Sequence, residues 1–106
     1  ETLGDTNYAI SVYNTYLESG NQNAQVLNQL GLCRMKVGDY EGALTAFQTA
    51  MNIEDNGMLQ TLKLNEIIAY EQLHDFQRAS VLMKSYLGTY PDDQEAQREY
   101  IFLKTR

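Results

Sequence analysis

The feature that most constrains the fold is an internal repeat. Ala9, Ala43 and Ala79 are separated by 34 and 36 residues, and an aspartate four positions before each alanine keeps the same spacing. Self-similarity at a period of this size is the signature of repeat proteins, in which each unit buries its apolar face against the next unit. The chain is therefore expected to be a stack of similar units.

Each repeat contains a stop signal for one helix followed at once by a start signal for the next. The signals are Leu3-Gly4-Asp5, Gly38-Asp39 and His74-Asp75. Glycine tolerates the left-handed conformation that ends a helix, and an aspartate can accept N–H bonds at the following N-terminus. Since His74 takes the glycine position, we interpret it as a turn residue and not as a catalytic base, which would need a positioned partner.

Apolar residues recur at helical spacing on both sides of these turns, which predicts six helices with short connections. Helices are expected after Asp5, Asp39 and Asp75, and a second helix type is expected over residues 24–37 and about 58–73. The apolar face after Asp39 is Tyr40, Ala43, Leu44, Phe47, Ala50 and Met51.

A last helix is expected over residues 92–106. Asp92 and Glu95 have the spacing of a capping box, with Asp92 in the cap position. The helix would carry the apolar residues Ala96, Tyr100, Ile101 and Leu103, and its polar positions suit a solvated outer face.

This phased pattern resembles the tetratricopeptide repeat, a helix–turn–helix unit of 34 residues. The residues that match its first helix, turn and second helix are Leu27, Leu30, Gly31, Gly38, Asp39, Tyr40, Ala43, Phe47 and Ala50. The next unit matches at Ala69, Tyr70, Asp75, Phe76, Ala79 and Pro91. The resemblance implies an all-α fold, an α–α superhelix built as a right-handed solenoid of antiparallel helix pairs, and gives an impression of bacterial origin.

The resemblance also divides the chain, a single domain over residues 1–106, into units. Residues 1–21 would be the second half of a truncated unit, residues 24–57 and 58–91 two full units, and residues 92–106 a capping helix. We expect the chain to be a piece of a longer repeat protein. Positions that depart from the family pattern are Arg34, Asp55, Glu66 and Ile67, together with a two-residue insertion around Asn56–Met58.

The charge balance argues against nucleic acids and anionic membrane surfaces as partners. The chain has 14 Asp+Glu against 8 Lys+Arg, and its net charge is -6. Binding to phosphates needs clustered basic residues, whereas Lys and Arg are scattered singly here. A helical-repeat RNA reader is disfavoured for the same reason. No window holds the roughly 20 apolar residues of a membrane span.

No pattern of catalytic, cofactor-binding or metal-ligating residues is found, so the chain is interpreted as a non-enzyme without cofactor. Cys33 lies on an apolar helix face and is expected to be a buried small hydrophobe. Asp92-Asp93 lacks the further spaced ligands of a calcium loop, and helix capping explains it. Gly38 and Gly57 belong to no phosphate-binding motif.

The resemblance implies that the first helices of the units line a concave groove that binds a protein or peptide. The residues predicted for it are Asn28, Leu32, Met35, Leu64, Asn65, Ile68, Glu71, Arg98 and Phe102. Some family members hold a peptide carboxylate with Lys, Asn and Arg at such positions. That mode is not expected, because only Asn28 and Asn65 correspond and the basic residues are absent.

Two alternatives accompany this interpretation. The apolar strip of Leu32, Met35, Leu64 and Ile68 could mark a docking site, since exposed apolar patches usually do, or could pack between adjacent units. The function expected is that of a non-catalytic interaction scaffold. The alternative is a recruiting or regulatory arm of a larger enzyme whose catalytic domain lies outside this sequence.

Overall fold

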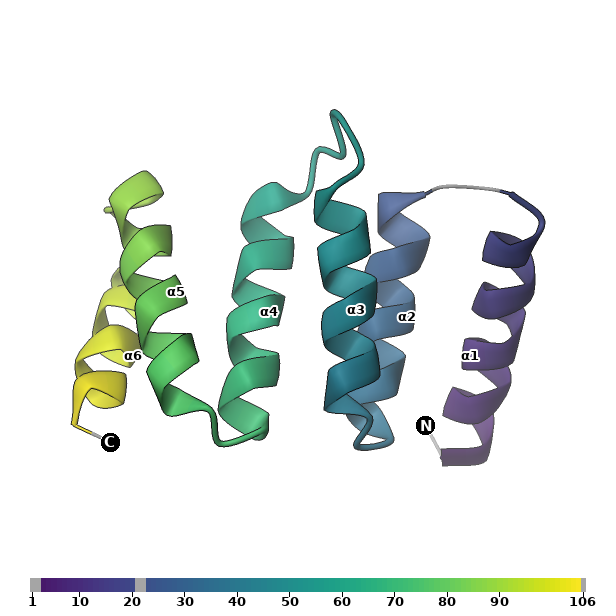
Figure 1. Ribbon diagram of the computed structural model, residues 1–106, viewed down its shortest axis with the longest axis horizontal. Helices are drawn as coiled ribbons and strands as arrows, with labels where there is room; N and C mark the ends of the chain where they lie inside the picture. Colours follow the sequence, from purple (N-terminus) through teal and green to yellow (C-terminus); the bar gives the residue numbers. More distant parts are fainter. Residues whose placement is uncertain (1–2, 21–22, 106) are drawn as a thin grey trace.

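A computed structural model describes residues 3–20 and 23–105, and Figure 1 shows them as a row of helices. The helices are α1 (Leu3–Glu18), α2 (Ala24–Lys36), α3 (Tyr40–Met51), α4 (Leu59–Gln72), α5 (Phe76–Thr89) and α6 (Gln94–Lys104). Successive helices run in opposite directions along the long dimension of a molecule of 41 × 31 × 20 Å. The described residues contain no strand, and the predicted all-α helical repeat fold is confirmed.

The turns that end α2 and α4 have the same construction. Gly38 and His74 have φ values of 84° and 62°, which is the left-handed region. The next residue in each turn, Asp39 or Asp75, donates its backbone N–H to a carbonyl of the preceding helix, at 2.8 and 3.0 Å. The same aspartates cap the following helices, because their Oδ1 atoms accept from the backbone N–H of the third residue on. Both predicted turns are confirmed.

The third predicted turn is not observed. Helix α1 begins at Leu3, so Gly4 and Asp5 lie inside its first turn and not in a connection before it. The side chain of Asp5 still complements the helix dipole from that position. Among the described residues of α1, Thr6 is the most deeply buried at 2% exposure, whereas Ala9 is half-buried.

The start of α6 also differs from the prediction, because Asp93 and not Asp92 is the cap. Oδ1 of Asp93 accepts from the backbone N–H of Ala96 at 3.1 Å, while its Oδ2 accepts from the hydroxyl of buried Tyr86 at 2.6 Å. This second bond selects Asp93 from the adjacent pair. Ile101, expected on the apolar face, is 65% exposed, since it lies off the i, i+4, i+7 row of that face.

The core consists of two clusters that follow the repeat. The first comprises Ala24, Leu27, Ala43, Leu44, Phe47, Ala50, Leu62 and Ala69, from α2, α3 and α4. The second comprises Ile67, Ala79, Met83, Tyr86, Ala96 and Leu103, from α4, α5 and α6. Ala43 and Ala79 are fully buried, as the repeat requires. Helix α4 contributes to both clusters and so joins the two units.

Equivalent positions in the two clusters exchange volume. In the first, Gly31 packs against the ring of Phe47, and a Cβ at Gly31 would approach ring carbons more closely than real Cβ atoms do. In the second, the positions 36 residues later hold Ile67 and Met83, both buried. A larger residue at the glycine position is therefore accompanied by a flexible thioether in place of the rigid ring, which keeps the interior filled.

The departures at Arg34 and Glu66 are explained by polar contacts. Nη1 of Arg34 donates to Oδ2 of Asp39 at 2.9 Å, which ties α2 to the cap of α3. Oε2 of Glu66 accepts from Nε2 of Gln48 at 2.9 Å and links α4 to α3.

The inserted residues form the connection between α3 and α4. Asn56 closes this loop on itself, because its side chain donates to the carbonyl of Ile53 and accepts from the backbone N–H of Met58. In Figure 1 the loop projects beyond the row of helices. Within residues 3–20 and 23–105, no helix has the length and apolar character that a membrane crossing requires.

Candidate partner-binding surface

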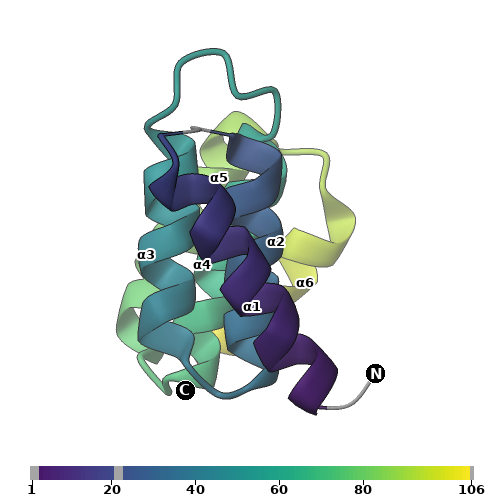
Figure 2. The same ribbon diagram turned by 90° about the vertical axis from the view of Figure 1, so that its right-hand side faces the viewer.

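The nine residues predicted for the groove lie on α2, α4 and α6. Figure 2 shows α2 and α6 on one side of the stack and α3 on the other. Helix α4 is joined to α2 by a hydrogen bond and to α6 by the second core cluster. The three helices therefore form one continuous face, which we call the α2–α4–α6 face.

The two asparagines of this face bind each other. Nδ2 of Asn65 on α4 donates to Oδ1 of Asn28 on α2 at 2.7 Å, and Asn28 is only 4% exposed. A buried amide needs such a partner, because an unsatisfied polar group costs free energy when it is removed from water. The pair thus links two units, and a direct role for Asn28 in partner binding stays a prediction.

The apolar strip is divided between core and surface. Leu32 and Met35 are half-buried against the first core cluster, and Leu64 is half-buried against the second. Ile68 is 39% exposed, although it lies next to the fully packed Ile67. Each of the two alternatives for the strip therefore describes part of it: three residues support the packing between helices, and Ile68 presents its side chain to solvent.

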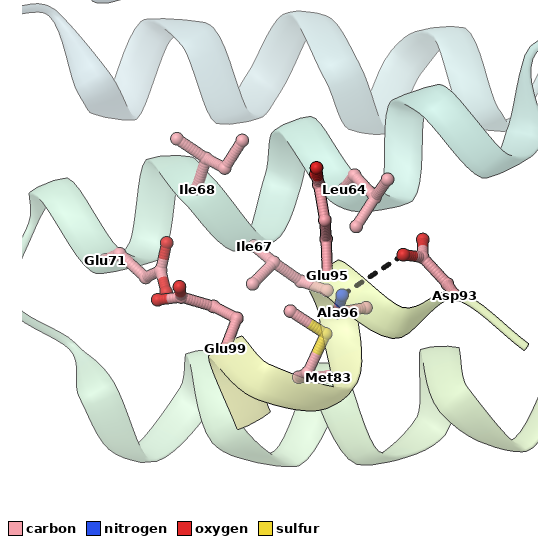
Figure 3. A pocket seen from close by; sticks show the side chains of 9 residues that line it. All are labelled: Leu64, Ile67, Ile68, Glu71, Met83, Asp93, Glu95, Ala96 and Glu99. Atoms are coloured by element: carbon pink, nitrogen blue, oxygen red, sulfur yellow. Dashed lines mark hydrogen bonds between the residues drawn. The ribbon is translucent and has the colours of Figure 1, made fainter. Parts of the chain in front are cut away.

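A pocket of about 240 Å³ opens between α4 and α6, above the α5 residue Met83 (Figure 3). Its apolar lining is Leu64, Ile67, Ile68, Met83 and Ala96, and its polar lining is Glu71, Asp93, Glu95 and Glu99. Figure 3 shows the carboxylates of Glu71 and Glu99 side by side at one end and Glu95 beside Leu64 at the other. The pocket combines an apolar floor with an acidic rim.

A second hollow continues from the first along the same two helices. Glu71 and Glu99 line both, and the second is closed by Gln72, His74, Phe76 and Phe102. Phe102 is 48% exposed, which is high for a large aromatic side chain. Arg98 is exposed on α6 and lines neither hollow. We call the two hollows together the α4–α6 groove.

A buried tyrosine holds the groove's inner end in place. The hydroxyl of Tyr86 donates to Asp93 at 2.6 Å and accepts from Nε2 of Gln60 at 2.9 Å, which connects α5 with the start of α6 and with α4. Burial, and then the bond to Asp93, raises the pKa of Tyr86 above its ordinary value. The bond from Tyr86, followed by that from the Ala96 backbone, lowers the pKa of Asp93.

The residues considered for chemistry have structural surroundings. His74 occupies the left-handed turn position and stacks edge-on against Phe76, with ring centroids 5.6 Å apart. Cys33 is buried at 8% exposure, as predicted. In the described part of the chain, His, Cys, Asp and Glu side chains form no group of three or more that could hold a metal ion.

Sequence reasoning missed five lining residues of the groove: Ile67, Met83, Glu95, Ala96 and Glu99. One signal was available, since Glu95 and Glu99 are four residues apart and therefore share one helix face. The pocket itself depends on how α6 packs against α4, which the repeat period does not specify.

Two comparisons with known proteins bear on this arrangement. Residues 24–56, which comprise α2, α3 and most of the loop that follows, match the family model described as tetratricopeptide repeat. No curated protein matches the chain.

Proposed function

We propose, from the premise that the chain contains a tetratricopeptide repeat at residues 24–56, that it binds a segment of a partner protein along the α2–α4–α6 face. Repeats of this class generally mediate protein–protein interactions. On this proposal the chain has no catalytic role of its own, and the same face would serve a free scaffold or a recruiting arm of a larger enzyme.

The observation that carries the proposal is the α4–α6 groove. Ile68 and Phe102 expose apolar surface along it, at 39% and 48%, although buried partners lie close by. Exposed apolar surface next to a hollow is typical of a recognition site, where a partner's side chain removes it from water. The groove is also bounded by rigid helices, so little order has to be gained on binding.

We further propose that the units are residues 1–21, 24–57, 58–91 and 92–106, within one domain. The equivalent turns at Gly38-Asp39 and His74-Asp75 support two full units in the middle. The position of α6 against α4 supports its role as the closing helix. Its exposed side includes the polar residues Gln94, Glu95, Gln97, Arg98 and Lys104.

The test uses peptides selected on the wild-type chain from a phage-displayed library of random dodecapeptides. Ile68→Asp should weaken the selected peptides by about tenfold or more, since a charge would be placed at the centre of a desolvated contact. Val81→Asp on α5 is the matched control, because Val81 is 63% exposed on a different helix. Fluorescence anisotropy measures affinity, and circular dichroism checks that both variants retain their helices.

Two outcomes would contradict the proposal. One is a library from which no peptide is enriched over a control selection on an unrelated helical protein. The other is a set of selected peptides that Val81→Asp weakens as much as Ile68→Asp does.

A further inference from the structure

The charged side chains that line the α4–α6 pocket all have the same sign. Four of its nine lining residues are carboxylates, five are apolar, and none is basic. Asp93 is committed to the fold through the cap of α6 and the bond to Tyr86. The other three are Glu71 from α4 and Glu95 and Glu99 from α6.

The placement of these three glutamates has an electrostatic cost. Glu95 and Glu99 are an i, i+4 pair of like charge, which destabilises a helix by a few tenths of a kcal/mol. Across the groove, Figure 3 shows Glu71 with its carboxylate next to that of Glu99. A positive charge placed among these carboxylates would offset the repulsion and gain attraction in partly desolvated surroundings.

The size and the floor of the pocket decide what kind of cation fits. Pockets for drug-sized ligands and cofactors measure about 300–1,000 Å³, so a pocket of about 240 Å³ suits one long side chain. A metal ion is disfavoured, since the described residues provide no cluster of three ligating groups. The apolar floor matches the aliphatic stem of lysine or arginine, whose charged head would reach the carboxylates.

We infer that the α4–α6 groove binds a partner segment through a lysine or arginine side chain seated in this pocket, with an apolar neighbour packed against Phe102. This inference rests on the proposed function and specifies its partner: an amphipathic segment with at least one basic residue. The second hollow, with Phe76 and Phe102, continues past Glu71 and Glu99 and takes the apolar neighbour. The chemistry is the reverse of capture of a peptide carboxylate.

The experiment neutralises the two carboxylates that both hollows share. Glu71→Gln/Glu99→Gln keeps the size of both side chains, and Glu54→Gln, in the exposed α3–α4 loop, is the control. Affinities are measured for the peptides selected on the wild-type chain and for copies in which each basic residue is replaced by norleucine. Norleucine retains an aliphatic stem and removes the charge.

The expected result is a double-mutant cycle with coupling. The selected peptides carry an excess of Lys or Arg, and the double variant weakens them by about five- to tenfold, as two partly exposed ion pairs would. One norleucine replacement weakens wild-type binding similarly and has no further effect on the double variant. The control variant binds as the wild type does.

Three results would overturn the inference. Selected peptides that depend on Ile68 but contain no excess of basic residues would refute the cationic occupant and leave the proposed function standing. Equal effects of norleucine on the wild type and on the double variant would refute the pocket. Dimerisation of the wild-type chain that the double variant abolishes, measured by analytical ultracentrifugation, would assign the groove to a second copy.

Discussion

Replacing Gly31 by alanine tests how the first unit packs. In a helix whose surroundings are open, glycine-to-alanine stabilises by roughly 1 kcal/mol, because alanine is the better helix former. At Gly31 the added Cβ would collide with the ring of Phe47, which is fully buried and enclosed by the first core cluster. Overpacking of a core costs about 1–3 kcal/mol. The two effects together predict a net loss of about 1 kcal/mol.

Thermal unfolding followed by circular dichroism measures this loss. For a domain of this size, about 1 kcal/mol corresponds to a fall in Tm of about 4–8 °C. Gly88→Ala is the matched control: Gly88 is also helical, and a Cβ there would meet nothing within 4 Å. We expect Gly88→Ala to leave the Tm unchanged or to raise it.

A third variant identifies the cause. In the Phe47→Leu background the ring is gone, so Gly31→Ala should become neutral or stabilising, with a coupling between the two sites. If Gly31→Ala raises the Tm of the wild-type chain as Gly88→Ala does, the packing of Phe47 on Gly31 is refuted.

Three further predictions concern the turns, the groove and the repeat. His74→Gly should raise the unfolding free energy by about 0.5–1 kcal/mol, because glycine relieves the left-handed backbone; an unchanged or lower Tm would contradict this. Tyr86→Phe should destabilise at neutral pH, and its deficit should shrink as the pH falls below 3.8, since the bond lowers the pKa of Asp93 and its stabilisation is lost on protonation; a pH-independent deficit in urea titrations would exclude the bond. Ala43→Leu should cost about 1–3 kcal/mol, because Ala43 is fully buried; an unchanged melting curve would count against the repeat register.

The sequence predicted the helices and their turns well, because these depend on local signals. Gly38-Asp39 and His74-Asp75 carry both a stop and a cap within two residues, and the structure uses both. The same reasoning failed at Asp92, where two adjacent aspartates offered equivalent caps. The choice between them is made by Tyr86, which is seven residues from Asp93 in the chain, and a local pattern does not contain it.

The candidate site was predicted less completely, because it depends on the packing of helices. The strip from Leu32 to Ile68 follows from helical spacing, but burial of each residue depends on the neighbour opposite it. Asn28 and Asn65 were assigned to a groove, whereas the structure joins them across two helices. The acidic rim required Glu71 on α4 to meet Glu99 on α6, which is a tertiary contact.

The central claim is that the face formed by α2, α4 and α6 is where a partner segment binds. Its most direct test is a titration of the ¹⁵N-labelled chain with one selected peptide, followed by backbone amide chemical shifts. The account predicts that the largest shifts cluster on α4 and α6, around Ile68, Glu99 and Phe102. Shifts confined to α3 and the exposed side of α5 around Val81 would contradict it.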